Sequence, residues 1–115
     1  MIEALITLAL VAALCVGCLA PLHWIAAAGA LGIVVGLLIG IPTGFGYHVA
    51  LGRVLGARGD LPERWWMRPT ALHDALEPHE LERIMPWFYV GGAGFALTIA
   101  GCVAFALAAL RAAAA

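Results

Sequence analysis

Two long stretches without a charged side chain constrain this chain more than any other feature of its sequence. Residues 4–51 contain no Asp, Glu, Lys or Arg, and residues 85–110 again contain none. An α-helix needs about 20 apolar residues to cross the hydrocarbon core of a bilayer. The first stretch is long enough for two crossings and the second for one. The sequence therefore predicts an all-α integral membrane protein with three transmembrane helices.

The limits of the three helices are predicted within a single membrane domain, residues 1–115. The first helix is expected over 2–20, because Pro21 cannot continue the backbone hydrogen-bond ladder. The second helix is expected over 23–52 and the third over 87–110. The connection after the first helix is so short that the first two helices are expected to form a tight antiparallel hairpin.

The second helix is too long for one straight crossing. Helical character continues to about residue 55, and a straight helix from residue 24 would be about 48 Å long at 1.5 Å per residue. The hydrocarbon core measures only about 30 Å. Pro42 lies inside this helix and removes one backbone hydrogen bond. We therefore expect a kink near Pro42 and a helix end that projects past the membrane surface.

The segment 53–84 carries nearly all of the charge in the chain and is expected to be a partly helical loop at the membrane surface. Thr70 is predicted to cap a short helix over 71–77, and Pro78 to occupy the first position of another helix. Amphipathic aromatic rings favour the membrane–water interface. The side chains expected there are Trp24, Tyr47, Trp65, Trp66, Trp87 and Tyr89.

The distribution of basic residues predicts the orientation, because loops rich in Arg or Lys stay on the cytoplasmic side. The other side of the membrane would carry only Arg111. We therefore expect a cytoplasmic N-terminus, a cytoplasmic 53–84 loop and an external C-terminus. The loop arginines are Arg53, Arg58, Arg64, Arg68 and Arg83.

Arg is the sole strongly basic residue type and Ala and Gly are abundant. This composition is typical of a GC-rich bacterial genome and favours a bacterial inner membrane.

Small residues recur at every fourth position on two of the expected helices. Such spacing allows two helix backbones to approach closely in lipid. The simplest interpretation is that these faces hold the three helices of one protomer together. A second interpretation is that one face receives a helix from another membrane subunit or a second copy of the chain. The predicted packing residues are Gly32, Gly36, Gly40 and Gly44 on the second helix, and Gly92, Ala96, Ala100 and Ala104 on the third.

Missing residue types exclude several enzyme mechanisms. The chain has no Ser, Asn, Gln or Lys, and therefore no serine nucleophile, no Schiff-base lysine and no Walker-type phosphate loop. A formal net charge of −1 argues against a nucleic-acid partner, which would favour a basic surface. We expect no catalytic residues and no enzymatic activity, with membrane lipids and other membrane subunits or the chain itself as partners.

His48 is the one residue that we single out as a candidate cofactor ligand. Its imidazole could ligate the iron of haem or the magnesium of a chlorophyll, and neighbouring glycines would leave room for a planar ring. The simpler interpretation is that His48 and Tyr47 form an interfacial pair that meets water and headgroups. We favour the simpler interpretation, and thus no cofactor.

The loop over 73–82 concentrates His, Asp and Glu but is expected to hold no metal ion. His73 and Glu77 could share one helix face, yet Pro78 breaks the geometry with the residues that follow. The expected alternative is a solvated loop with internal ion pairs, for example Glu80 with Arg83.

These observations favour a non-catalytic accessory or structural subunit of a larger bacterial membrane complex. A haem- or pigment-carrying subunit using His48 is one alternative. A homo-oligomeric channel or small transporter built on the glycine face of the second helix is another.

Overall fold

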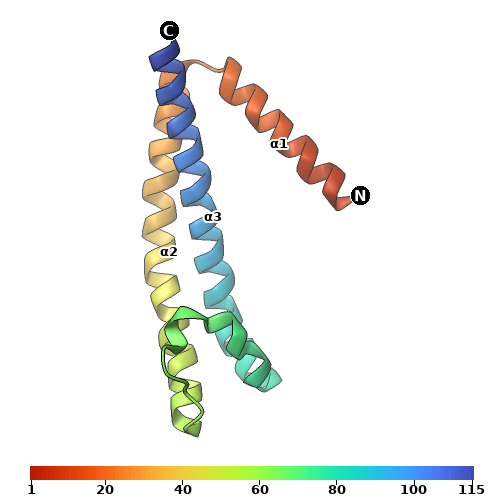
Figure 1. Ribbon diagram of the computed structural model, residues 1–115, viewed down its shortest axis with the longest axis vertical. Coiled ribbons are helices and arrows are strands. Elements are labelled where there is room, and N and C mark those ends of the chain that lie inside the picture. Colours follow the sequence, from red (N-terminus) through yellow and green to blue (C-terminus); the bar gives the residue numbers. More distant parts are fainter. The chain divides into compact units, whose positions relative to one another are not determined.

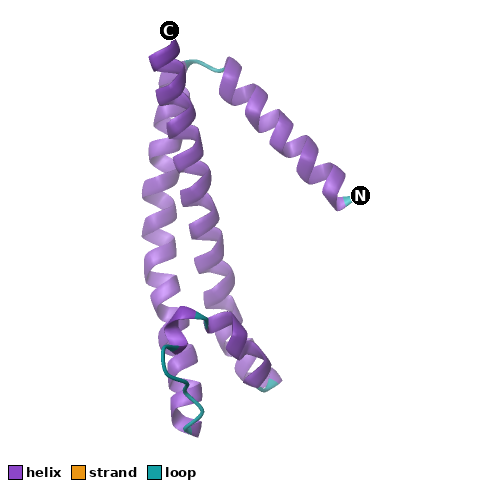
Figure 2. Cartoon of the chain, in the orientation of Figure 1, coloured by secondary structure: helices purple, strands orange, loops and turns teal.

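All 115 residues are described by the structure, a computed structural model, and every regular element in it is helical (Figures 1 and 2). The elements are α1 (Ile2–Leu19), α2 (Leu22–Arg58), the 3₁₀ helices η1 (Trp65–Met67) and η2 (Pro69–Ala75), and α3 (Pro78–Ala114). The three α-helices are each long and apolar enough to cross a membrane. The prediction of an all-α chain with three such helices is confirmed.

Helices α2 and α3 both extend past their charge-free stretches. A helix of 37 residues is about 55 Å long, so each exceeds a hydrocarbon core of about 30 Å. Helix α2 continues through Pro42, where the Thr43 hydroxyl donates to the carbonyl of Ile39 at 2.5 Å. The kink at Pro42 stays a prediction. A helix does begin at Pro78, as the sequence predicted, but it continues through Pro86 as the single helix α3, so the start predicted at residue 87 for the third long helix is wrong.

The end of α2 is fixed by a glycine in the left-handed conformation. Gly59 has a φ of 73°, which only a residue without a Cβ adopts at no cost. The Gly59 N–H then donates to the carbonyl of Gly56 at 3.2 Å, and the Asp60 N–H to that of Leu55 at 3.1 Å. This is the Schellman arrangement, which satisfies the last carbonyls of a helix. It turns the chain into the segment that leads to η1.

The segment between α2 and α3 is only partly helical, and one local detail of it was predicted wrongly. The helix expected over 71–77 is the 3₁₀ helix η2, which begins at Pro69, and no side chain caps it. Thr70 therefore does not act as the N-cap. Pro69 lacks an N–H and has a preset φ, which suits the first position of a helix.

The chain forms two compact units. One comprises Met1–Val35 with Leu97–Ala115, and the other comprises Gly36–Ala96. Each unit takes part of α2 and part of α3.

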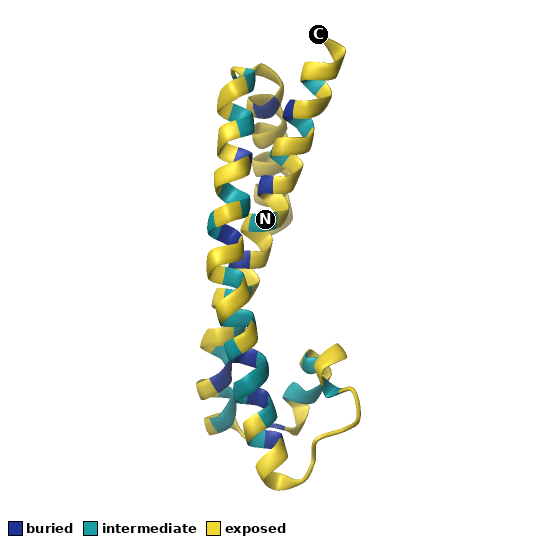
Figure 3. Cartoon of the chain, turned by 90° about the vertical axis from the view of Figure 1, so that its left-hand side faces the viewer, coloured by how far each residue is buried: buried dark blue, intermediate teal, exposed yellow.

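In the first unit, α1 is held only by its C-terminal end. Every residue from Met1 to Val16 is exposed, and exposed residues are drawn yellow in Figure 3. Gly17 is buried, and a Cβ there would lie 2.5 Å from Cδ2 of Leu107. Arg111 donates from Nη1 to the carbonyls of Gly17 at 2.7 Å and Ala20 at 2.8 Å. A basic side chain is favourable there, because the last carbonyls of a helix have no partner within it. The tight hairpin of the first two helices stays a prediction.

The second unit contains the main cluster of buried apolar side chains. Leu51, Leu55 and Ile84 are fully buried, and Tyr47 is only 4% exposed. Tyr47, Leu51 and Leu55 lie four apart on α2 and share one face, as helical geometry requires. Leu76 and Ile84, which complete the cluster, come from the charged half of the sequence. The end of the first apolar stretch and the charged segment that follows it therefore build a small protein core together.

Candidate functional site

The second unit brings together most of the ring-bearing side chains that the sequence placed near the polar loop. Tyr47 on α2 hydrogen-bonds to His73 on η2, with its hydroxyl 2.5 Å from Nε2 of the imidazole. Phe88 on α3 closes the group, its ring centroid 5.4 Å from each of the other two. One residue from each of three elements thus meets at a single point. Tyr47 lies inside this group rather than on an exposed interfacial surface.

His48 lies on a different side of α2, and one of its two ring nitrogens already makes a hydrogen bond within the helix. Its Nδ1 lies 2.9 Å from the carbonyl oxygen of Gly44, one turn earlier in the helix. A carbonyl only accepts, so Nδ1 carries the proton and donates, and Nε2 of the neutral ring keeps its lone pair. No residue of the chain hydrogen-bonds to Nε2. Because no buried side-chain N or O atom lacks a partner, Nε2 is open to the surroundings.

A groove of about 580 Å³ runs past His48, and it is open along one side. The indole of Trp65 forms one wall, its centroid 6.1 Å from that of His48. Gly52 permits this approach, because a Cβ at position 52 would lie 2.8 Å from Cη2 of Trp65. Helix α2 contributes Phe45, His48, Val49, Gly52 and Arg53, and the following segment contributes Leu61, Trp65 and Trp66. The lining is apolar except for the imidazole and the guanidinium.

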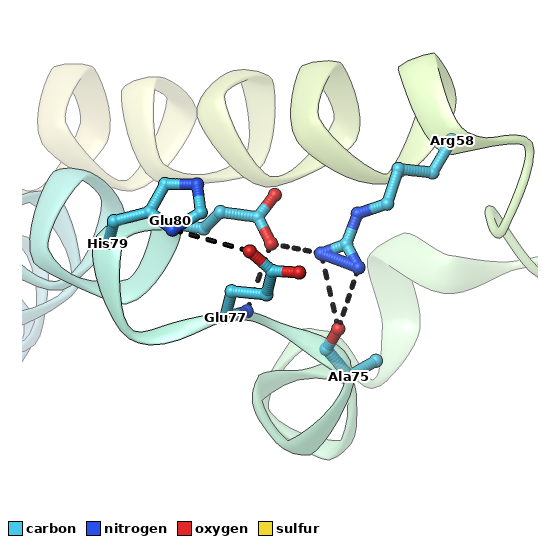
Figure 4. Close-up of polar contacts among 5 residues, drawn as sticks. All are labelled: Arg58, Ala75, Glu77, His79 and Glu80. Atoms are coloured by element: carbon cyan, nitrogen blue, oxygen red, sulfur yellow. Dashed lines mark hydrogen bonds and ion pairs between the residues drawn. The ribbon is translucent and has the colours of Figure 1, made fainter.

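Arg58, the last residue of α2, ties its own helix to the end of η2 and to the start of α3 (Figure 4). Both terminal nitrogens donate to the carbonyl of Ala75, at 3.1 and 3.2 Å, and Nη2 also pairs with Oε1 of Glu80. The backbone N–H of Glu77 donates to the same oxygen at 2.9 Å. Glu80 at the third position of α3 thus caps the residue before the helix, as in a capping box. The predicted pairing of Glu80 with Arg83 is wrong, because the fold brings Arg58 to it instead.

The electrostatic consequence is clearest at Glu80, which precedes the apolar part of α3. The hydrogen bond from the Glu77 N–H, together with the Arg58 guanidinium, holds the pKa of the Glu80 carboxyl below its ordinary value of 4.5. Both partners favour the charged form of the carboxylate. The charged form of Glu80 therefore stabilises the start of α3.

The remaining polar groups are dispersed. No group of three or more His, Cys, Asp or Glu side chains is placed to hold a metal ion. His73 turns to Tyr47, whereas His79 lies 3.4 Å from Glu77 on the exposed surface. The cysteines are unpaired and exposed at Cys15, Cys18 and Cys102.

The predicted packing glycines of the second helix lie along α3, in one unit or the other. A Cβ on Gly32 would come 3.3 Å from Gly101 Cα, and one on Gly40 would come 3.4 Å from the backbone of Gly94. Gly36 is buried, and its carbonyl lies beside Gly94. Gly44 has nothing within 4 Å of its own Cβ position.

The predicted packing residues of the third helix are mostly exposed and are not its points of closest approach to α2. Gly92, Ala96 and Ala100 are exposed and Ala104 is half-buried. The close approaches are made instead at Gly94 in the second unit and Gly101 in the first. A Cβ on Gly94 would fall 2.6 Å from the Gly40 nitrogen, and one on Gly101 would fall 2.7 Å from the Gly29 carbonyl oxygen. The available signal was a spacing of seven, shared by Gly94, Gly101 and Ala108 on α3 and by Gly29 and Gly36 on α2.

Four of the aromatic residues predicted at the interface are strongly exposed: Trp24, Trp66, Trp87 and Tyr89. Trp65 is half-buried in the wall of the groove. Trp87 lies over Gly46, where a Cβ would meet the indole at 2.6 Å.

Comparison of the chain with models of protein families, with characterised proteins and with solved structures gives no match. Its function must therefore be argued from its own residues.

Proposed function

We propose that this chain is a multi-pass protein of a bacterial inner membrane, with its N-terminus and 53–84 segment in the cytoplasm and its C-terminus outside. The length and apolar character of α1, α2 and α3 support membrane insertion. Many large apolar side chains point outward on these helices, for example Leu14, Leu38 and Phe95, which suits a surrounding of lipid. The Arg-rich segment supports the orientation.

Within that membrane, we propose a non-catalytic role as an accessory or structural subunit of a larger complex. The single observation that carries this proposal is the exposure of α1. Its residues from Met1 to Val16 make no buried contact within the chain, although small residues at Ala9 and Ala13 would permit close packing. A helix so free of internal contacts is available to other transmembrane helices. The absence of Ser and Lys, which excludes a serine nucleophile and a Schiff-base lysine, supports a structural role rather than a catalytic one.

The experiment is purification of a tagged copy from its native membrane in a mild detergent, followed by sizing and identification of the co-purifying chains. The accessory role predicts defined partners in fixed proportion. Substitution of Ala9 and Ala13 by Leu should release them, because bulk on this face prevents close approach. Ala112→Leu, at an exposed position on α3 rather than on α1, is the matched control. A chain that runs alone, or only with copies of itself, contradicts the proposal and favours a homo-oligomeric assembly.

A further inference from the structure

We propose that the groove beside His48 binds a single anionic phospholipid whose headgroup carries hydroxyl groups, of the phosphatidylglycerol class. This inference concerns a ligand rather than a partner subunit, and it rests only on the membrane location proposed above.

The position of the groove on α2 is the first step. Phe45 and Val49 lie within the charge-free stretch, whereas Arg53 is the first charged residue after it. The groove therefore runs from the hydrocarbon level to the headgroup level. An acyl chain can lie along Phe45 and Val49, and the indole rings of Trp65 and Trp66 suit the glycerol region, where amphipathic rings are favoured.

The charge in the groove is the second step. Arg53 lines it, is exposed, and has no ion-pair partner in the chain, whereas Arg58 is fully engaged with Ala75 and Glu80. A guanidinium at the cytoplasmic surface attracts anionic lipid, and its fork of donors matches phosphate oxygens. The groove thus supplies one positive charge at the depth where a phosphodiester lies.

The free nitrogen of His48 is the third step. Because Nδ1 donates to the carbonyl of Gly44, Nε2 is left as a hydrogen-bond acceptor that faces the surroundings without a partner. A phosphate alone offers no proton to such an acceptor. A headgroup with hydroxyl groups does, so one ligand satisfies both Arg53 and His48.

The open side of the groove favours a lipid over a planar cofactor. Sites for compact organic ligands usually bury most of the ligand surface, and a metal macrocycle would need apolar walls on both of its faces. Here one wall is Trp65 and the other side is open. The surrounding hydrocarbon can complete the enclosure of an acyl chain, because it is itself apolar.

The test uses the full-length chain in lipid nanodiscs, with native mass spectrometry counting retained lipids. Three headgroups separate the contributions: phosphatidylglycerol, with charge and hydroxyls; phosphatidylmethanol, with charge alone; and phosphatidylcholine, with neither net charge nor hydroxyl. We expect retention to fall in that order. Each step should be about fivefold, the size expected for one basic side chain at a membrane surface and for one hydrogen bond.

Substitutions test which residue causes each of the two decreases in lipid retention. Arg53→Gln should lower phosphatidylmethanol to the level of phosphatidylcholine and leave phosphatidylglycerol about fivefold above both, through the hydrogen bond of its hydroxyls to His48. His48→Phe should lower phosphatidylglycerol to the level of phosphatidylmethanol and leave the latter unchanged. Arg83→Gln makes the same change of charge outside the groove and should retain the wild-type pattern. Gly52→Leu, which obstructs the wall, should abolish both steps, and circular dichroism checks that each variant remains helical.

Three results would overturn the proposal. Equal retention of the three lipids would show that the groove is not a specific lipid site. If Arg83→Gln lost the preference for anionic lipid as much as Arg53→Gln does, the preference would be general electrostatic attraction and not binding in the groove. A visible absorption band that disappears in His48→Phe assigns the groove to a haem or chlorin instead. The outcome is independent of the accessory role, since a chain that purifies alone but prefers phosphatidylglycerol contradicts only the partner proposal.

Discussion

The hydroxyl of Tyr47 lies 2.5 Å from Nε2 of His73, and this one bond joins the middle of α2 to a 3₁₀ helix 26 residues further along the chain. Both side chains also contact the ring of Phe88 on α3. Tyr47 is 4% exposed, so its hydroxyl has little access to water as a substitute partner.

Tyr47→Phe should destabilise the second unit by about 1 kcal/mol, the usual net contribution of one hydrogen bond. The phenyl ring keeps the packing, so the loss reports the bond to His73 alone. Thermal unfolding in detergent, followed by circular dichroism, measures the effect. Tyr89→Phe removes an exposed hydroxyl and should be neutral. Equal stability of the two variants would show that the Tyr47–His73 bond contributes nothing.

Alanine at two glycines on the same helix should change stability in opposite directions. Gly94→Ala places a Cβ 2.6 Å from the Gly40 backbone nitrogen, so α2 and α3 must separate, at a cost of about 1–3 kcal/mol. Gly92→Ala meets nothing within 4 Å and should gain up to about 1 kcal/mol from helix propensity. Unfolding curves of both variants, compared with that of the wild type, measure the two changes in stability. Destabilisation by Gly92→Ala instead would mean that this face is covered by a partner.

The stability that Glu80 contributes should disappear in acid. Its pKa is lowered in the folded chain, so the contribution is fully present above the ordinary value of 4.5 and is lost as the pH falls through the lowered pKa. Glu80→Gln keeps the hydrogen-bonding oxygen for the Glu77 N–H but loses the charge. Wild type should therefore exceed this variant in melting temperature at neutral pH, and the two should converge at low pH. Glu82→Gln, which removes a neighbouring exposed carboxylate, should not reproduce this difference.

Single cysteines should report which side of the membrane each end occupies. In a background with Cys15, Cys18 and Cys102 replaced by Ala, we expect Glu63→Cys to react with a membrane-impermeant maleimide only after the cytoplasmic side is opened. Ala115→Cys should react in intact cells. Reaction of both positions from the same side would exclude three crossings, since α3, the one long apolar helix between them, would then not cross the membrane.

The sequence alone was sufficient for the number and type of the helices. The charge-free stretches over 4–51 and 85–110 favour helices, because in an apolar surrounding a single helix satisfies its own backbone groups. The effects of proline and glycine on helix ends could also be predicted from the sequence. Pro78 starts α3 and Gly59 helps to end α2, because both depend on the backbone angles of one residue.

The contacts between elements could not be predicted in the same way. The spacing of four along α3 points to Gly92, whereas the position of Gly40 makes Gly94 the point of approach. Glu80 could have paired with Arg83, one helical turn away, but the turn at Gly59 carries the chain back so that Arg58 reaches it. His48 and Tyr47 are adjacent, yet helical geometry sends one to an open groove and the other into the core.

The three helices long and apolar enough to cross a membrane were thus determined by composition and by single residues, because burial in hydrocarbon depends on the run of side chains along the chain. The pairing of Tyr47 with His73 and the close contact at Gly94 were decided only by the tertiary structure. Each depends on the distance between atoms far apart in sequence, which periodicity does not fix.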